Sequence, residues 1–336
     1  MSEKREYLSK KGLILIGTIF LAILVVGLIL LFLGFNEEFY STNSTVRALF
    51  KAITYLGEPI VFVILFAIIF IGYDKKFAKN LVISLLLTLF VNQWIKQLFK
   101  DTRPPTNEEG GVLIETSYGF PSAHAQNAVG FWGYMAYKWK NKSKPFVLPV
   151  VPTILSILIF LVAISRIIIG VHDLQDIIGG LLIGIAILMV FIYLEPVVSE
   201  QFNKLSFTLK ITIAVIISIL IFLIPTFLYP KAGVGLLPSA PSYSDNGAFG
   251  LVGGVLLGSG IGYILEGEYI KYEPKTLNTK QKILNVVIGL IVLLAIFFPL
   301  EYVLKIDSVF YRFARYAILA FILTFVLPLL FKKINK

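Results

Sequence analysis

Long apolar runs separated by short polar breaks dominate the chain. Most of the runs have about the 20 apolar residues that a helix needs to cross the hydrocarbon core of a bilayer. The pattern therefore predicts an all-α fold, a polytopic transmembrane bundle of about ten helices. The predicted spans are 12–35, 59–73, 80–99, 122–139, 147–168, 172–194, 211–229, 246–265, 282–304 and 309–331.

Two segments near the N-terminus need a separate interpretation. The run 12–35 is too long for the apolar core of a cleaved signal peptide and lacks a small-x-small cleavage site, so we expect a retained span. The segment 38–56 is apolar on one side only. That pattern predicts an interfacial helix lying against the outer leaflet.

Composition excludes several classes of protein. Hydrophobic residues make up 57% of the chain and charged residues 15%, and the mean hydropathy is +0.85. A soluble domain of this size could not cover so much apolar surface. The chain has no cysteine, which excludes disulfides and thiolate metal sites. The net charge of +10 comes from lysines between apolar runs rather than from a basic stripe, so it indicates membrane topology and not a nucleic-acid partner.

The distribution of Lys and Arg predicts the orientation. With both termini in the cytoplasm, the cytoplasmic segments hold 20 of the 30 basic residues. The loop 100–121 and the start of the span 172–194 then face the extracytoplasmic side, and so do both histidines. We also expect two parts: a six-helix core, 1–196, with the unusual polar residues at span ends, and a four-helix extension, 197–336, of unknown role.

The two histidines stand in contexts that suit chemistry. His172 and Asp176 are four residues apart, so the carboxylate can hold one ring nitrogen and leave the other as a nucleophile or base. His124 follows Ser122 in the stretch "PSAH", where Ser122 can cap a helix whose free N–H groups suit an oxyanion.

Three cations accompany the histidines at the span ends. Lys96 precedes Arg103 by seven residues, about two helical turns, and Pro104 and Pro105 are expected to stop that helix. Arg166 lies at the end of the span 147–168, which precedes the span that begins at His172. Guanidinium and ammonium groups beside a helix N-terminus make a phosphate pocket. Two histidines could divide the work there, one attacking phosphorus and the other protonating the leaving oxygen.

Three motifs, K-x6-RP, PSxH and SR-x5-H-x3-D, occur in this order, and together they resemble the signature of the type 2 phosphatidic acid phosphatase family. The resemblance covers about residues 80–195 and, by hydropathy, the core 12–195, whereas 197–336 lies outside it. In this sequence the motif residues are Lys96, Arg103 and Pro104; Pro121, Ser122 and His124; and Ser165, Arg166, His172 and Asp176.

The resemblance implies an integral membrane enzyme that hydrolyses a lipid phosphate or diphosphate through a phosphohistidine, without a metal or another cofactor. His172 would be the nucleophile, Asp176 would orient it, and His124 would be the general acid. We expect a polyprenyl diphosphate slightly ahead of a phosphatidate-type glycerolipid. The phosphoryl oxygens would be bound by Lys96, Arg103, Ser122, the backbone N–H of Ala123 and Arg166.

Some alternatives stay open at this point. Ala123 stands where the family usually has glycine, which puts close backbone approach to phosphate in question. A phosphotransferase could use the same intermediate, and a lipid transporter or scramblase could use intramembrane charges without chemistry. The glycines that recur every four residues in 246–265 predict close helix packing within the bundle, or else a homodimer through that helix.

Overall fold

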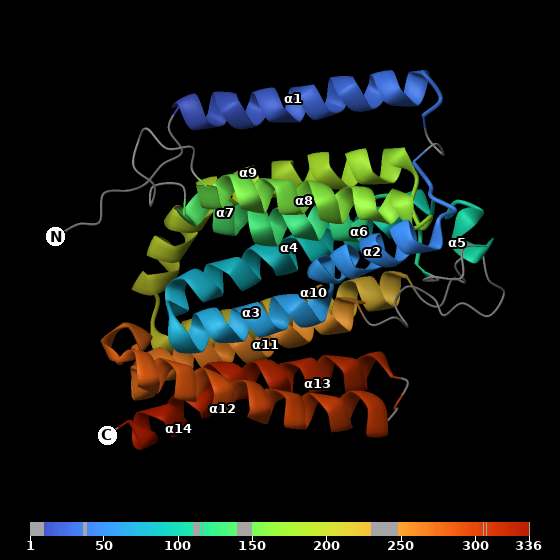
Figure 1. Cartoon of the computed structure of the whole chain (residues 1–336). Coiled ribbons are helices and arrows are strands. Elements are labelled where there is room, and N and C mark those ends of the chain that lie inside the picture. The colour runs from blue at the N-terminus through green and yellow to red at the C-terminus, as the bar shows by residue number, and fades with distance from the viewer. Residues whose placement is uncertain are drawn as a thin grey trace. The chain divides into compact units, whose positions relative to one another are not determined.

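The structure is a computed structural model. It describes residues 10–35, 39–109, 115, 117–139, 150–229, 248–304, 306 and 308–335. In these ranges every regular element is a helix, which confirms the predicted all-α class (Figure 1). The helices fall into two compact units. The first contains the described residues up to Val61 and from Leu87 to Gln201, and the second contains Phe62–Leu86 and the described residues from Phe202 onwards.

The helices of the first unit follow the predicted spans closely. Helix α4 enters it from the second unit, and α9 continues to Lys204, past the predicted end of its span at 194. The predicted domain boundary at 196 therefore lies inside a helix, and the division itself stays a prediction. The bounds are α1 Lys10–Phe32, α2 Ser44–Thr54, α4 Lys75–Phe99, α5 Thr106–Glu109, α6 Ala123–Ala128, α7 Tyr134–Trp139, α8 Val150–Ile168 and α9 Leu174–Lys204.

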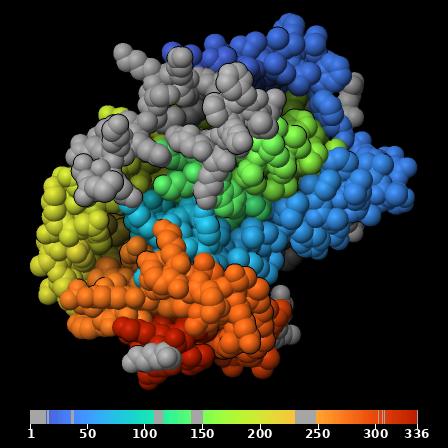
Figure 2. Space-filling view, turned by 60° about the vertical axis from the view of Figure 1, so that its left-hand side comes forward, coloured from blue at the N-terminus to red at the C-terminus, as the bar shows by residue number. Residues whose placement is uncertain are grey.

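The second unit consists mainly of the C-terminal helices. Helix α12 exposes Ile283, Val287 and Ile291, which recur every four residues as a face in contact with lipid would. Figure 2 shows the surface that these C-terminal segments present, in orange and red. The bounds are α3 Pro59–Gly72, α10 Phe207–Leu228, α11 Ala248–Leu265, α12 Thr279–Phe298, α13 Val309–Phe321 and α14 Leu327–Ile334.

The glycines of α11 are used inside the second unit. Helix α11 packs against α10 and α13. A Cβ atom at Gly254 would lie 2.3 Å from the carbonyl oxygen of Phe313, and one at Gly258 would lie 2.0 Å from that of Ala317. Only glycine permits this approach of two backbones. The glycine face therefore packs inside the second unit, as the first of the two alternatives predicted.

The number of spans is close to the prediction. In the described part of the chain seven helices are long and apolar enough to cross a membrane, or eight if the bent pair Ser44–Gly57 and Pro59–Gly72 is one span. The two remaining predictions are shorter apolar stretches. Gly17–Phe32 covers most of the span 12–35, and the span 122–139 is interrupted by a π-helical segment, Val129–Gly133. Length and composition together identify an integral membrane protein.

Candidate active site

His172 lies in the short turn between α8 and α9, within the first unit. Its Nδ1–H donates to Oδ2 of Asp176 at 2.8 Å, and the backbone N–H of Asp173 donates to the same oxygen at 3.2 Å. Both side chains are buried. Because α9 begins at Leu174, the pair is formed across the first turn of this helix. The ring is thereby fixed in the tautomer whose Nε2 carries the lone pair.

Arg103 contacts the free nitrogen of His172. Its Nη1 lies 2.8 Å from Nε2 of His172 and donates to the carbonyl oxygen of Val171 at 2.7 Å. Its Nε and Nη2 donate to the carbonyl and hydroxyl oxygens of Ser117 at 2.8 and 2.9 Å. The spacing from Lys96 had suggested that Arg103 lies on the same helix, but it does not. Helix α4 ends at Phe99, where Lys100 adopts a positive φ of 49°, so the helix stops before the two prolines.

Lys96 is buried at the end of α4 and holds the loop before "PSAH". Its Nζ donates to the carbonyl oxygens of Tyr118 and Gly119. Gly119 has no room for a side chain, because a Cβ atom there would lie 2.8 Å from Oδ2 of Asp101 and 3.2 Å from Oδ2 of Asp176. Lys96 therefore lies near Asp176, and its ammonium group is directed at the carbonyl oxygens of this loop.

Ser122 begins helix α6, which carries His124. Its hydroxyl oxygen accepts from the N–H of Ala125 at 3.4 Å, so the predicted N-cap is confirmed, and its own N–H donates to the carbonyl oxygen of Asp176 at 3.0 Å. Among the described residues other than glycine, only Lys100 and Lys271 have a positive φ. Ala123 thus sits in ordinary helical backbone, and the freedom of glycine is not required there.

The buried side-chain amides of Asn92 and Gln126 hold the turn that precedes α6. The side chain of Asn92 on α4 donates to the carbonyl oxygen of Pro121 at 3.1 Å and to Oε1 of Gln126 at 2.9 Å. Gln126 in turn donates to the carbonyl oxygen of Thr88 at 2.8 Å. Asn92 and Gln126 therefore tie the turn at Pro121 to helix α4.

Arg166 is fully buried on α8 and meets two residues that no motif had indicated. Its Nη1 donates to the hydroxyl of Thr54 at 2.9 Å, and its Nη2 pairs with the carboxylate of Glu115. Its motif neighbour Ser165 donates instead to the carbonyl oxygen of Val162, one turn back, at 2.6 Å. Ser165 thus serves its own helix, and Arg166 alone supplies this part of the site.

His124 has a carboxylate partner that sequence reasoning also missed. Its Nε2 lies 3.2 Å from Oε1 of Glu58, which immediately precedes α3. The ring is packed against Gly57, where a Cβ atom would lie only 2.9 Å from Cδ2 of His124. The signal in the sequence was a single acidic residue between two apolar runs, at a predicted span end.

Burial and the neighbouring charges set the protonation of His172 and Glu115. Burial lowers the pKa of His172 well below its usual range, and the cations Arg103, Lys96 and Arg166 lower it further. The ring is therefore neutral. Burial alone would raise the pKa of Glu115, but Arg166 and Arg103 outweigh it and hold the pKa at about 2. Glu115 is thus an anion that neutralises part of the positive charge of Arg166 and Arg103.

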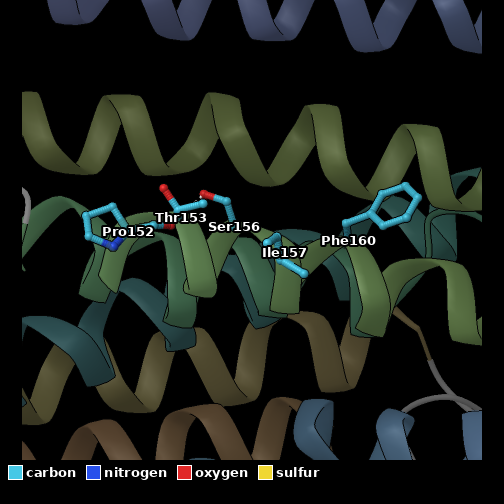
Figure 3. Close-up of a pocket in the computed structure, with 5 residues that line it drawn as sticks. All are labelled: Pro152, Thr153, Ser156, Ile157 and Phe160. Carbon is cyan, nitrogen blue, oxygen red and sulfur yellow. Dashed lines mark hydrogen bonds between the residues drawn. The ribbon is translucent and has the colours of Figure 1, made fainter. Parts of the chain in front are cut away.

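A hollow elsewhere on α8 is separate from this cluster. It has a volume of about 480 Å³ and is lined by one helix alone (Figure 3). None of the charged residues named above lines it. Over the described ranges no group of three His, Cys, Asp or Glu side chains could hold a metal ion. The lining residues of the hollow are Pro152, Thr153, Ser156, Ile157 and Phe160.

Two family models match the chain. The family model of the PAP2 superfamily matches residues 77–199, which include all three motifs. The chain carries a PAP2 superfamily domain. A second model, the transmembrane extension of PAP2 superfamily phosphatases, matches residues 251–336. The C-terminal helices lay outside the resemblance of the sequence motifs. Most of them fall in this match to the transmembrane extension of PAP2 superfamily phosphatases.

Individual relatives are lipid phosphatases. The chain is 27% identical to sphingosine-1-phosphate phosphatase 2 of Mus musculus over 47% of its length and 45% of that protein. It is 32% identical to phosphatidylglycerophosphatase B of Bacillus subtilis over 30% of its length and 47% of that protein. It thus spans about half the length of these relatives. A crystal structure of a transmembrane PAP2 type phosphatidylglycerolphosphate phosphatase from Bacillus subtilis aligns with a TM-score of 0.42 at 20% identity, covering 57% of this chain and 98% of that one.

Proposed function

We propose that the protein is a membrane lipid phosphatase that works through a phosphohistidine at His172. The observation that carries the proposal is the state of this ring. Asp176 holds Nδ1–H at 2.8 Å, so the lone pair is on Nε2, and that nitrogen faces the guanidinium of Arg103. A neutral, oriented imidazole beside a phosphate-binding cation is the arrangement that nucleophilic attack on phosphorus requires.

The chemistry proceeds in two displacements. Nε2 of His172 attacks phosphorus, the bond from phosphorus to the lipid oxygen breaks, and that oxygen takes a proton from His124. Water then attacks the phosphohistidine and passes a proton back to His124, while the P–N bond breaks and phosphate leaves. The Nδ1–H of His172 stays hydrogen-bonded to Asp176 throughout. The carboxylate thereby stabilises the cationic ring of the intermediate.

Phosphate binding exchanges the partners of the cations. Arg103 must turn its Nη1 from Nε2 of His172 to a phosphoryl oxygen, which frees the lone pair for attack. Arg166 can offer its Nε–H, which has no partner among the described residues, and its Nη2 can exchange the carboxylate of Glu115 for a phosphoryl oxygen. Lys96 contributes charge from its place behind the loop, and the N-terminus of α6 at Ser122 and Ala123 offers N–H groups.

The distribution of Lys and Arg favours the extracytoplasmic face for the site. His172 and His124 lie at helix ends that the positive-inside rule places outside, with both termini in the cytoplasm. A site at the ends of the spans would meet the headgroup of a lipid. The names of both relatives specify phosphorylated lipids, and this favours a lipid with a single terminal phosphate over the polyprenyl diphosphate that we first preferred.

A panel of purified lipids tests the proposal. Phosphate release is measured from sphingosine-1-phosphate, phosphatidate, phosphatidylglycerophosphate and a polyprenyl diphosphate, in detergent micelles. We expect release from at least one of them, inhibition by vanadate, no loss of activity with EDTA, and no release by His172→Ala. Transfer to an added alcohol instead of water would establish a phosphotransferase. Lipid movement that persists in His172→Ala without phosphate release would establish a transporter.

A further inference from the structure

The segment between α2 and α3 reaches the active site, although no sequence motif includes it. We call residues 54–58 the elbow. Helix α2 ends at Thr54, a 3-10 turn spans Tyr55–Gly57, and α3 begins at Pro59. All five residues of the elbow belong to the first unit, together with both histidines.

Each face of the elbow is fixed by a separate contact. The hydroxyl of Thr54 accepts from Arg166 at 2.9 Å, and the carbonyl oxygen of Leu56 accepts from the indole N–H of Trp132 at 3.3 Å. Gly57 leaves just enough room for the ring of His124, because a Cβ atom would approach Cδ2 to 2.9 Å. These contacts come from α8, from the π-helical segment and from α6. The position of Glu58 relative to His124 is therefore determined by packing on three sides.

We propose that Glu58 is a positioning residue for His124, and this inference rests on the proposed function. The carboxylate of Glu58, 3.2 Å from Nε2 of His124, holds that nitrogen and favours the protonated ring. Nδ1 is then the nitrogen that delivers a proton to the leaving oxygen. Each histidine would thus have its own carboxylate: Asp176 for the nucleophile and Glu58 for the acid.

The other nearby carboxylate cannot take this part. Glu115 is committed to the guanidinium of Arg166. Among the ion pairs of the described residues Glu58 pairs with no Lys or Arg, and its carboxylate contacts the ring of His124. Its side chain keeps 28% of its exposure, against 13% for that of His124. Water can therefore reach the pair, as the return of a proton in the second displacement requires.

The test compares two leaving groups on one alkyl chain. An alkyl phosphate releases an alcohol and needs the proton of His124, whereas a nitrophenyl phosphate that bears the same chain releases a stable phenolate and does not. We expect Glu58→Gln to lower kcat about 30-fold or more for the alkyl phosphate and less than about threefold for the nitrophenyl phosphate. Tyr55→Phe, in the exposed part of the elbow, is the matched control and should change neither.

Two further measurements distinguish a positioning role of Glu58 from a merely structural one. The double variant of Glu58→Gln with His124→Ala should be no slower than His124→Ala alone, because Glu58 acts through that ring. Equal losses on both substrates, or additive losses in the double variant, would overturn the inference. His172→Ala separates the two proposals: activity that survives it refutes the proposed function, whereas a dead His172→Ala with an indifferent Glu58→Gln refutes only the role of Glu58.

Discussion

Replacing Asp176 by Asn removes one charge from the site and almost no volume. Oδ2 of Asp176 accepts from Nδ1 of His172 at 2.8 Å and from the N–H of Asp173 at 3.2 Å, and the amide oxygen of Asn can accept both bonds. The resting ring is neutral, so the change costs little before reaction. In the proposed mechanism its cost arises when Nε2 bonds to phosphorus and the ring becomes cationic.

The size of this cost follows from the distance. A unit charge pair at this separation is worth about 6 kcal/mol at an effective dielectric constant of 20. Part of that attraction is replaced by the dipole of the amide, which leaves about 4 to 5 kcal/mol. At 1.36 kcal/mol for each factor of ten, the phosphorylation step should slow about 10³- to 10⁴-fold.

The assay is single-turnover phosphate release by rapid quench, with KM measured alongside. Asp176→Asn should lose rate with less than about a threefold change in KM. Asp173→Asn makes the same chemical change three residues away and should retain nearly full rate. A rate for Asp176→Asn within tenfold of the parent protein would refute the idea that a carboxylate supports a cationic His172.

Three other predictions concern the pH dependence of kcat/KM, the carboxylate of Glu115 and the packing of Gly258 in the C-terminal extension. Because burial and cations lower the pKa of His172, the neutral nucleophile persists below pH 6.5, so the loss of kcat/KM that protonation of this ring causes should begin only below pH 6.5. Glu115→Gln removes the carboxylate that pairs with Arg166, which we propose as a phosphate ligand, so vanadate should inhibit about tenfold more tightly. Gly258→Ala should destabilise the protein by about 1 to 3 kcal/mol, since its Cβ would lie 2.0 Å from the carbonyl oxygen of Ala317, as measured by thermal unfolding in detergent.

Each of these has a control or an opposing outcome. A decline of kcat/KM centred at pH 6.5 would mean that His172 titrates as an ordinary solvated ring. Weaker inhibition by vanadate in Glu115→Gln would show that the carboxylate supports anion binding instead of competing with it. Gly267→Ala, where nothing lies within 4 Å of the new Cβ, should leave the unfolding temperature unchanged, and an equal shift there would contradict the packing argument.

The sequence allowed the helices and the local pairs to be predicted. Apolar runs fix span positions because the bilayer sets their length, and the pair of His172 and Asp176 is four residues apart, so a single turn of chain brings them together. The spacing of Lys96 and Arg103 misled in one respect. It assumed a helix through position 103, whereas α4 ends at Phe99.

The remaining contacts depend on packing between distant segments. Thr54 and Arg166 are 112 residues apart, Glu58 and His124 are 66 apart, and no periodicity links them. Glu115 is separated from Arg166 by 51 residues, including the whole of α6 and α7. Such partners follow only once the order in which helices pack is known.

Trapping the covalent intermediate tests the central claim most directly. The protein is mixed with a lipid carrying labelled phosphate, quenched in alkali, which preserves phosphohistidine, and digested for mass spectrometry. The account predicts that the label lies on His172, that it accumulates in one turnover, and that it is absent from His172→Ala. Turnover without any labelled histidine, or a label on His124, would contradict it.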